Sequence, residues 1–172
     1  MSTPGAVTGE HADLLQALDK QRGLLRGTTR GLTDEQAAQR TTVSELCLGG
    51  LIKHVALAER RWGGFILEGP SAMGPRDEAS MTAWMNAFRM LDGETLAGLL
   101  EMYQEVARRT DELVATLPDL DARQPLPEAP WFEPGASWSA RRVLMHLIAE
   151  TAQHAGHADI IRESLDGAKS MA

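Results

Sequence analysis

The sequence predicts an all-α fold, a four-helix bundle with one short extra helix and a Pro-rich crossover. Four long segments repeat apolar residues at helical spacing, and no segment alternates apolar and polar residues as a half-buried strand does. Pairs of turn residues separate the segments, as at 69–70, 92–93 and 166–167. Because 172 residues are enough for one well-filled core, we expect a single domain over 1–172, with frayed ends at 1–9 and 168–172.

Apolar faces and capping signals define the first two long helices. Residues 11–30 form one helix, with an apolar face made by Leu14, Leu15, Leu18, Leu25 and Thr28. The segment 33–36 resembles a capping box, and 42–45 resembles a second one. The second box predicts that the next long helix starts near residue 43, and Gly69-Pro70 ends it after about residue 67.

Three further helices are expected in the rest of the chain. Residues 81–91 form a short amphipathic helix that we expect to cover one end of the bundle. Residues 96–117 carry the strongest periodicity of the sequence. The segment 118–138 has too many prolines for a regular element and is expected to cross the bundle end as an extended connection. Ser139 is a plausible N-cap for the last helix, which ends near Leu165.

Composition excludes several classes of function. The net charge of −7 provides no basic surface for a nucleic acid, and no run of about 18 apolar residues is present to span a membrane. The one cysteine, Cys47, cannot form an intramolecular disulfide, and no N-terminal signal segment is recognisable. We therefore expect a cytoplasmic protein, with Cys47 as a small buried apolar residue.

A stripe of polar side chains on the last helix is the most informative motif. At about 100° per residue, Glu150, His154 and His157 lie within about 60° of one another, and His146 lies close to them. A carboxylate and imidazoles stacked on one helix face are typical of a metal site. Two other interpretations remain open at this point: a solvated polar face, or a buried histidine satisfied by a neighbouring carboxylate. His146 supports the site or only packs.

A third ligand must come from another helix, and His54 is the histidine available in the second long helix. Both helices place these polar residues at the edge of an apolar face, with the face centred about 60° away in each case. Two helices packed by those faces would bring the polar edges together, as in other bundle metal sites. The sequence therefore predicts that the helices containing His54 and His154 are neighbours.

Residues 49–62 and 146–163 resemble the DinB-like superfamily, specifically its actinobacterial mini-circle-protein branch, which is related to mycothiol-dependent maleylpyruvate isomerase. The resemblance implies a bundle of the DinB-like type that holds a divalent metal. It implies His54, Glu150 and His154 as ligands, and zinc as the metal, with nickel or another divalent ion left open. The commoner family pattern has histidine where Glu150 stands, whereas the isomerase is similar to this chain in using a His, Glu, His set.

The resemblance implies a metal-dependent thiol S-transferase that acts in detoxification. An open zinc position deprotonates a bound thiol, and the implied thiol is mycothiol, with bacillithiol or glutathione as alternatives. Its partners would then be this thiol and an electrophilic small molecule, with no nucleic acid or membrane, and a homodimer is left open. Two other functions remain open: a metal-dependent hydrolase, and a non-catalytic metal- or ligand-binding stress protein.

Four further residues complete the expected site. His157 is the expected catalytic group, orienting the thiol or relaying its proton, although a fourth-ligand or outer role is open. Arg61 is a candidate for binding an anionic substrate group, although helix arginines are more often solvated or paired. Trp138 is expected to form a wall of the substrate pocket. Asp159 is expected to contact substrate, or to act as the base in the hydrolase alternative.

Overall fold

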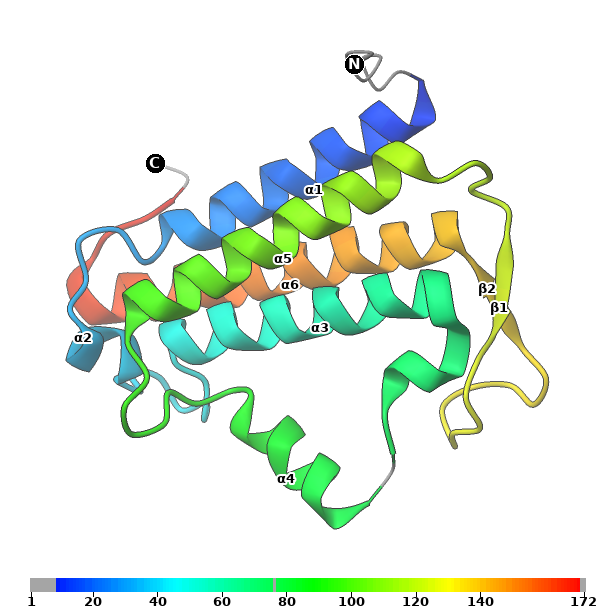
Figure 1. Ribbon diagram of the computed structural model, residues 1–172. Helices are drawn as coiled ribbons and strands as arrows, with labels where there is room; N and C mark the ends of the chain where they lie inside the picture. Colours follow the sequence, from blue (N-terminus) through cyan, green and yellow to red (C-terminus); the bar gives the residue numbers. More distant parts are fainter. Residues whose placement is uncertain (1–8, 76, 171–172) are drawn as a thin grey trace.

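The computed structural model describes residues 9–75 and 77–170, and its main body is a bundle of four long helices (Figure 1). The long helices are α1 (Glu10–Gly27), α3 (Leu48–Glu68), α5 (Leu96–Thr116) and α6 (Ala140–Asp166). The short elements are α2 (Asp34–Ala38), the 3-10 helix η1 (Gly69–Met73), α4 (Glu78–Asn86) and the strands β1 (Arg123–Pro125) and β2 (Ser137–Ser139). The predicted all-α bundle is confirmed, and α2 and η1 are additional to the one short helix expected.

The long helices pack in a ring that sets two polar edges side by side. Helix α1 packs on α6, α6 on α3, and α3 on α5, whereas α1 and α5 touch less extensively. Helices α1 and α6 run in one direction and α3 and α5 in the other (Figure 1). The predicted contact between the helix of His54 and the helix of His154 is confirmed. Within the described residues, no helix is both long and apolar enough to cross a membrane.

One of the two predicted capping boxes forms and the other does not. Thr33 and Gln36 make the reciprocal bonds of a capping box and start α2. The Thr42 hydroxyl instead accepts a hydrogen bond from the amide of Ser44, two residues on, and Val43 is fully exposed. Helix α3 therefore begins at Leu48, and the predicted start near residue 43 was wrong.

Helix α4 lies beside α3 rather than over an end of the bundle, contrary to expectation (Figure 1). It is also shorter than the predicted 81–91 helix, and none of its residues is buried. In the turn that follows α4, the Phe88 ring stacks on His54 with 3.9 Å between ring centroids. Gly50 permits this approach, because a Cβ atom at that position would overlap the carbonyl oxygen of Phe88.

The Pro-rich segment crosses the end of the bundle and contains two short strands. Strand β1 pairs antiparallel with β2, and Gln124 stands opposite Trp138. The Gln124 side-chain amide also donates to the carbonyl of Ile66 near the end of α3. The expectation that no regular element fits this segment was therefore wrong, because a two-stranded ladder tolerates Pro125 at its edge. The Ser139 hydroxyl caps α6 as predicted.

A buried ion pair lies between two apolar clusters of the core. One cluster contains Leu25, Val55 and Tyr103, and the other contains Leu18, Phe65 and Val114. Between them, Arg22 of α1 pairs with Glu59 of α3, and the two side chains are 1% and 0% exposed. Arg22 also donates to Asp111 of α5 at 2.8 Å, so one guanidinium connects three helices.

Candidate metal centre

Three side chains from two helices converge on one oxygen atom. His54 stands in the second turn of α3, and Glu150 and His154 stand one turn apart on α6. Oε1 of Glu150 lies 3.2 Å from Nε2 of His54 and 3.3 Å from Nε2 of His154. One donor atom from each residue lies within 4.8 Å of the other two. The matched polar edges predicted for these helices therefore do meet.

The donor set and its spacing fit a divalent metal. Two imidazole nitrogens and one carboxylate oxygen form a set typical of catalytic zinc, which keeps another position open. Ligands about 2.0–2.1 Å from a tetrahedral ion are separated from one another by roughly 3.3 Å, close to the two distances above. Across residues 9–75 and 77–170, this is the one group of three or more His, Cys, Asp or Glu whose donors come close enough to share an ion.

The electrostatics of the group suit a cation. Hydrogen bonds from His154 and then from His54 hold the pKa of Glu150 well below its usual range, and they outweigh burial, which raises it. Glu150 is therefore ionised at neutral pH and presents a negative charge to the two rings. His54 and His154 are themselves buried. A half-buried carboxylate that is already ionised, beside two imidazoles, can bind a cation without first losing a proton of its own.

His157 and Phe88 support the two histidine rings from outside the group. Nδ1 of His157 lies 3.4 Å from Nδ1 of His154, the ring nitrogen that faces away from Glu150. The Phe88 ring covers one face of His54, with 20° between the two ring planes. The spacing of polar residues on α6 had indicated His157. No sequence signal linked Phe88, in the turn after α4, to His54 of α3.

Trp138 belongs to an aromatic cluster one helical turn from Glu150. It stacks on Trp62 of α3 with 4.8 Å between ring centroids. Both indoles contact His146 edge-on, and Arg142 lies over the Trp138 ring at 4.5 Å. Burial lowers the pKa of His146, and the charge of Glu150 opposes that shift. His146 thus packs between the cluster and the candidate metal centre.

The hydrogen bonds described for Arg61 and Asp159 are made to groups other than the three converging residues. Arg61 donates to the carbonyl oxygen of Met73, which ends η1. The Asp159 carboxylate accepts from the amide of Ser170 at 2.7 Å, and its position on α6 is about 140° around the helix from His154. Cys47 is buried, as expected.

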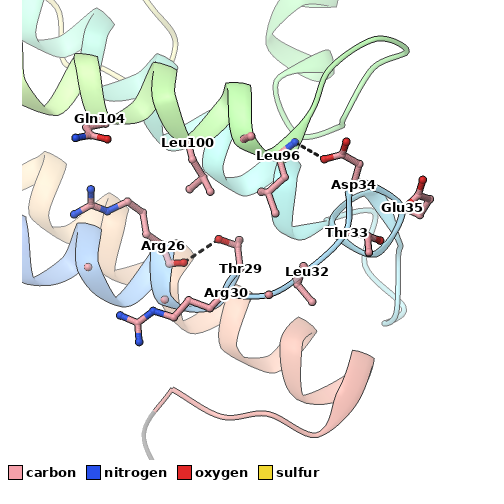
Figure 2. Close-up of a pocket in the computed structure, with 14 residues that line it drawn as sticks. Arg26, Thr29, Arg30, Leu32, Thr33, Asp34, Glu35, Leu96, Leu100 and Gln104 are labelled. Atoms are coloured by element: carbon pink, nitrogen blue, oxygen red, sulfur yellow. Dashed lines mark hydrogen bonds between the residues drawn. The ribbon is translucent and has the colours of Figure 1, made fainter.

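A surface cavity of about 830 Å³ lies elsewhere, between the end of α1 and the start of α5 (Figure 2). The loop after α1 and the start of α2 border it, and Asp34, the first residue of α2, accepts a hydrogen bond from the amide of Leu96 at the start of α5. Arginine and acidic side chains both line this cavity, together with Leu100. None of the predicted site residues lines this cavity. The cavity and the candidate metal centre are therefore separate places in the molecule.

The chain matches a known protein family over most of its length. A family model described as mycothiol-S-transferase matches residues 13–167. The matched range covers most of the chain and contains the three converging residues with their supporting neighbours. No curated protein matches the chain.

Proposed function

The chain belongs to the mycothiol-S-transferase family, and we propose that it is a metal-dependent enzyme that joins mycothiol to an electrophilic small molecule. The convergence of His54, Glu150 and His154 carries the proposal. Zinc is the proposed metal, since two histidines and a carboxylate suit it, with nickel or another divalent ion as the alternative. We also propose a cytoplasmic location and a role in detoxification.

A divalent ion held by these residues would supply the positive charge that lowers the pKa of an incoming thiol, so that the thiol reacts as a thiolate at neutral pH. Glu150 contributes one negative charge and the two histidines none, which leaves a net charge of about +1 to favour the thiolate. The thiolate sulfur then forms a bond to the electrophilic carbon. A leaving group departs with the bonding pair, and the thiol proton passes to solvent or to a nearby base.

We assign His157 a positioning role. If Nε2 of His154 bound the ion, Nδ1 would carry the ring proton and would donate to Nδ1 of His157, which lies 3.4 Å away. This hydrogen bond would fix the tautomer and the orientation of His154. Phe88 restricts His54 in a similar way by covering its ring. Substrate contacts by Trp138, Arg61 and Asp159 stay predictions. The Trp138 ring meets His146, which stands one turn before Glu150 on α6 and feels its charge.

Metal analysis tests the ligand assignment. The purified wild type should hold about one equivalent of divalent metal per chain, and His54→Ala and His154→Ala should lose most of it at neutral pH. His11→Ala is the control, because His11 lies near the carbonyl of Leu117 and takes no part in the centre. Unchanged metal content in both ligand variants would rule out the assignment.

Turnover tests the reaction. The metal-loaded protein should consume mycothiol in the presence of an electrophile, and cobalt in place of zinc should change its absorption spectrum when the thiol is added. Hydrolysis without thiol would instead favour the hydrolase, with a metal-activated water as nucleophile. If a broad panel of electrophiles shows neither reaction and cobalt gives no spectral change, the protein is a metal- or ligand-binding protein.

A further inference from the structure

Helix α4 carries large apolar side chains that the bundle does not bury. Met81, Trp84 and Met85 are 67%, 55% and 56% exposed. They occupy one side of the helix, because residues three and four positions apart are neighbours on a helical surface. Exposed apolar groups gathered in this way are typical of surfaces that bind a ligand or a partner.

This apolar stripe is continuous with the candidate metal centre. The Trp84 ring meets His54 edge-on with 6.3 Å between centroids, and it meets Phe88 edge-on at 5.3 Å. Phe88 in turn stacks on His54. The stripe therefore begins at a proposed metal ligand and extends outward through Trp84 to Met81. A molecule that reacts at the centre and extends along α4 would contact these side chains first.

We propose that Trp84, together with Met81 and Met85, binds the apolar part of the electrophile, so that the enzyme prefers electrophiles with an aromatic or other large apolar group. This inference rests on the transferase function proposed above. An indole ring stacks on planar apolar groups of many kinds. Methionine side chains are flexible and polarizable, and adapt to different shapes. The surface thus suits a class of apolar electrophiles rather than one particular molecule.

The test compares an aromatic electrophile with a small polar one. 1-Chloro-2,4-dinitrobenzene and iodoacetamide both form a carbon–sulfur bond with the thiol and release a halide ion that takes the bonding pair. For Trp84→Ala, the ratio of kcat/KM for the aromatic electrophile to kcat/KM for iodoacetamide should fall roughly tenfold, mainly through KM. Trp84→Phe should recover most of the ratio. Ile160→Ala is the control, because Ile160 is an apolar α6 residue that is 62% exposed and belongs to no part of the site.

Three outcomes would overturn the inference. An unchanged ratio in Trp84→Ala, in an enzyme that does conjugate the thiol, overturns it and leaves the proposed function intact. Absence of thiol-dependent turnover by the metal-loaded wild type overturns both. Sedimentation that shows a dimer in the wild type and a monomer in Trp84→Ala would assign the stripe to a second copy of the chain instead.

Discussion

A single oxygen of Glu150 lies within hydrogen-bonding distance of rings on two different helices. The hydrogen bonds from His154 and then His54 lower the pKa of this carboxyl group in the folded protein. A carboxyl group with a lowered folded pKa stabilises the folded state above its unfolded pKa of about 4.3, and that stabilisation is lost as the pH falls through the folded value. The negative charge of Glu150 should therefore contribute to the stability of the metal-free protein at neutral pH.

Replacement of Glu150 by glutamine isolates this contribution. In metal-free protein, Glu150→Gln should lower the free energy of unfolding by about 1–2 kcal/mol between roughly pH 5 and 7. The difference from wild type should shrink as the pH falls below about 4, because the carboxyl group of the unfolded wild-type chain is then protonated, and should vanish once the folded carboxylate is protonated at still lower pH. Urea denaturation at a series of pH values and constant ionic strength measures both effects. A difference that increased at acid pH would contradict the explanation.

His157 should matter to the metal more than to the fold. His157→Ala should weaken metal binding by about 10–100-fold, because the replacement removes the partner of the outer nitrogen of His154. Competition with a chromogenic chelator measures the affinity, and circular dichroism shows whether the fold is kept. If metal affinity stays at the wild-type value while thiol turnover is lost, His157 acts on the substrate, as the sequence had suggested.

Spacing and resemblance were enough to predict that His54, Glu150 and His154 converge, whereas their role as metal ligands stays a prediction. What they could not supply is the identity of the atoms that meet. The sharing of Oε1 between two rings depends on how α3 and α6 pack, and so does the contact of His157 with the outer nitrogen of His154. The stacking of Phe88 on His54 depends on the turn after α4, and the sequence of that turn does not show which residue Phe88 packs against.

At the scale of an element, two glycines of α3 provide a matched pair. A Cβ atom at Gly50 would overlap the backbone of Phe88, whereas the nearest atom to a Cβ at Gly63 would be the Thr110 hydroxyl, 3.8 Å away. Alanine in a helix interior is favoured over glycine by about 1 kcal/mol when space is available. Alanine should therefore raise the free energy of unfolding at one of the two positions and lower it at the other.

Gly63→Ala should raise the free energy of unfolding by about 0.5–1 kcal/mol. Gly50→Ala should lower it by about 1–3 kcal/mol and should also weaken metal binding, since it displaces the turn that holds Phe88 against His54. Chemical denaturation and metal titration of both variants measure the effects. A stabilised Gly50→Ala protein with normal metal affinity would show that the turn is not packed as described.

The ends of the helices show where local patterns suffice and where they do not. The Thr33 box and the Ser139 cap were predicted correctly, because each is completed by residues within one turn. The Thr42 pattern has the same letters, but its hydroxyl bonds to the amide of Ser44 and the chain stays irregular up to Cys47. The exposure of the apolar face of α4 could not be predicted either, because an apolar stripe on a helix normally marks a face that packs against the core.

At the scale of the whole molecule, the Arg22–Glu59 pair holds the middle of the bundle together. The pair lies between the two apolar clusters and is almost entirely out of solvent. Loss of one member of such a pair leaves a buried charge without its partner, whereas replacement of both members by apolar residues removes that penalty. Removal of Arg22 would leave the buried Glu59 without this partner, and removal of Glu59 would leave the buried Arg22 to Asp111, whose side chain is 48% exposed.

Glu59→Ala should reduce the free energy of unfolding by about 3–5 kcal/mol. The double variant Arg22→Met/Glu59→Met should recover most of that loss. Arg108→Ala is the control, since Arg108 pairs with Glu105 and Glu112 on the surface and should change stability by less than about 1 kcal/mol. Denaturation of Glu59→Ala, of the double variant and of Arg108→Ala measures these differences in stability. A double variant less stable than Glu59→Ala would contradict it.

The sequence carried a signal for this pair that periodicity alone could not interpret. Arg22 occupies the same apolar face of α1 as Leu18 and Leu25, where a charged side chain is unusual. Its partner stands 37 positions away on another helix, among 24 acidic residues of the chain. The choice of Glu59 follows from the arrangement of α1 against α3, which only the assembled bundle defines.

His54 and Glu150 are 96 positions apart along the chain, and this separation bears on how fast the protein is degraded in a cell. An unfolded chain has no preformed site, so an ion held by these residues would bind the native state alone, and free ion at a hundredfold excess over its Kd would add about 2.7 kcal/mol of stability. The fraction of molecules open to proteases would then fall about a hundredfold. The supply of the metal would in this way govern how long each molecule survives as well as whether it is active, and a metal-starved cell would hold less of the protein at the same rate of synthesis.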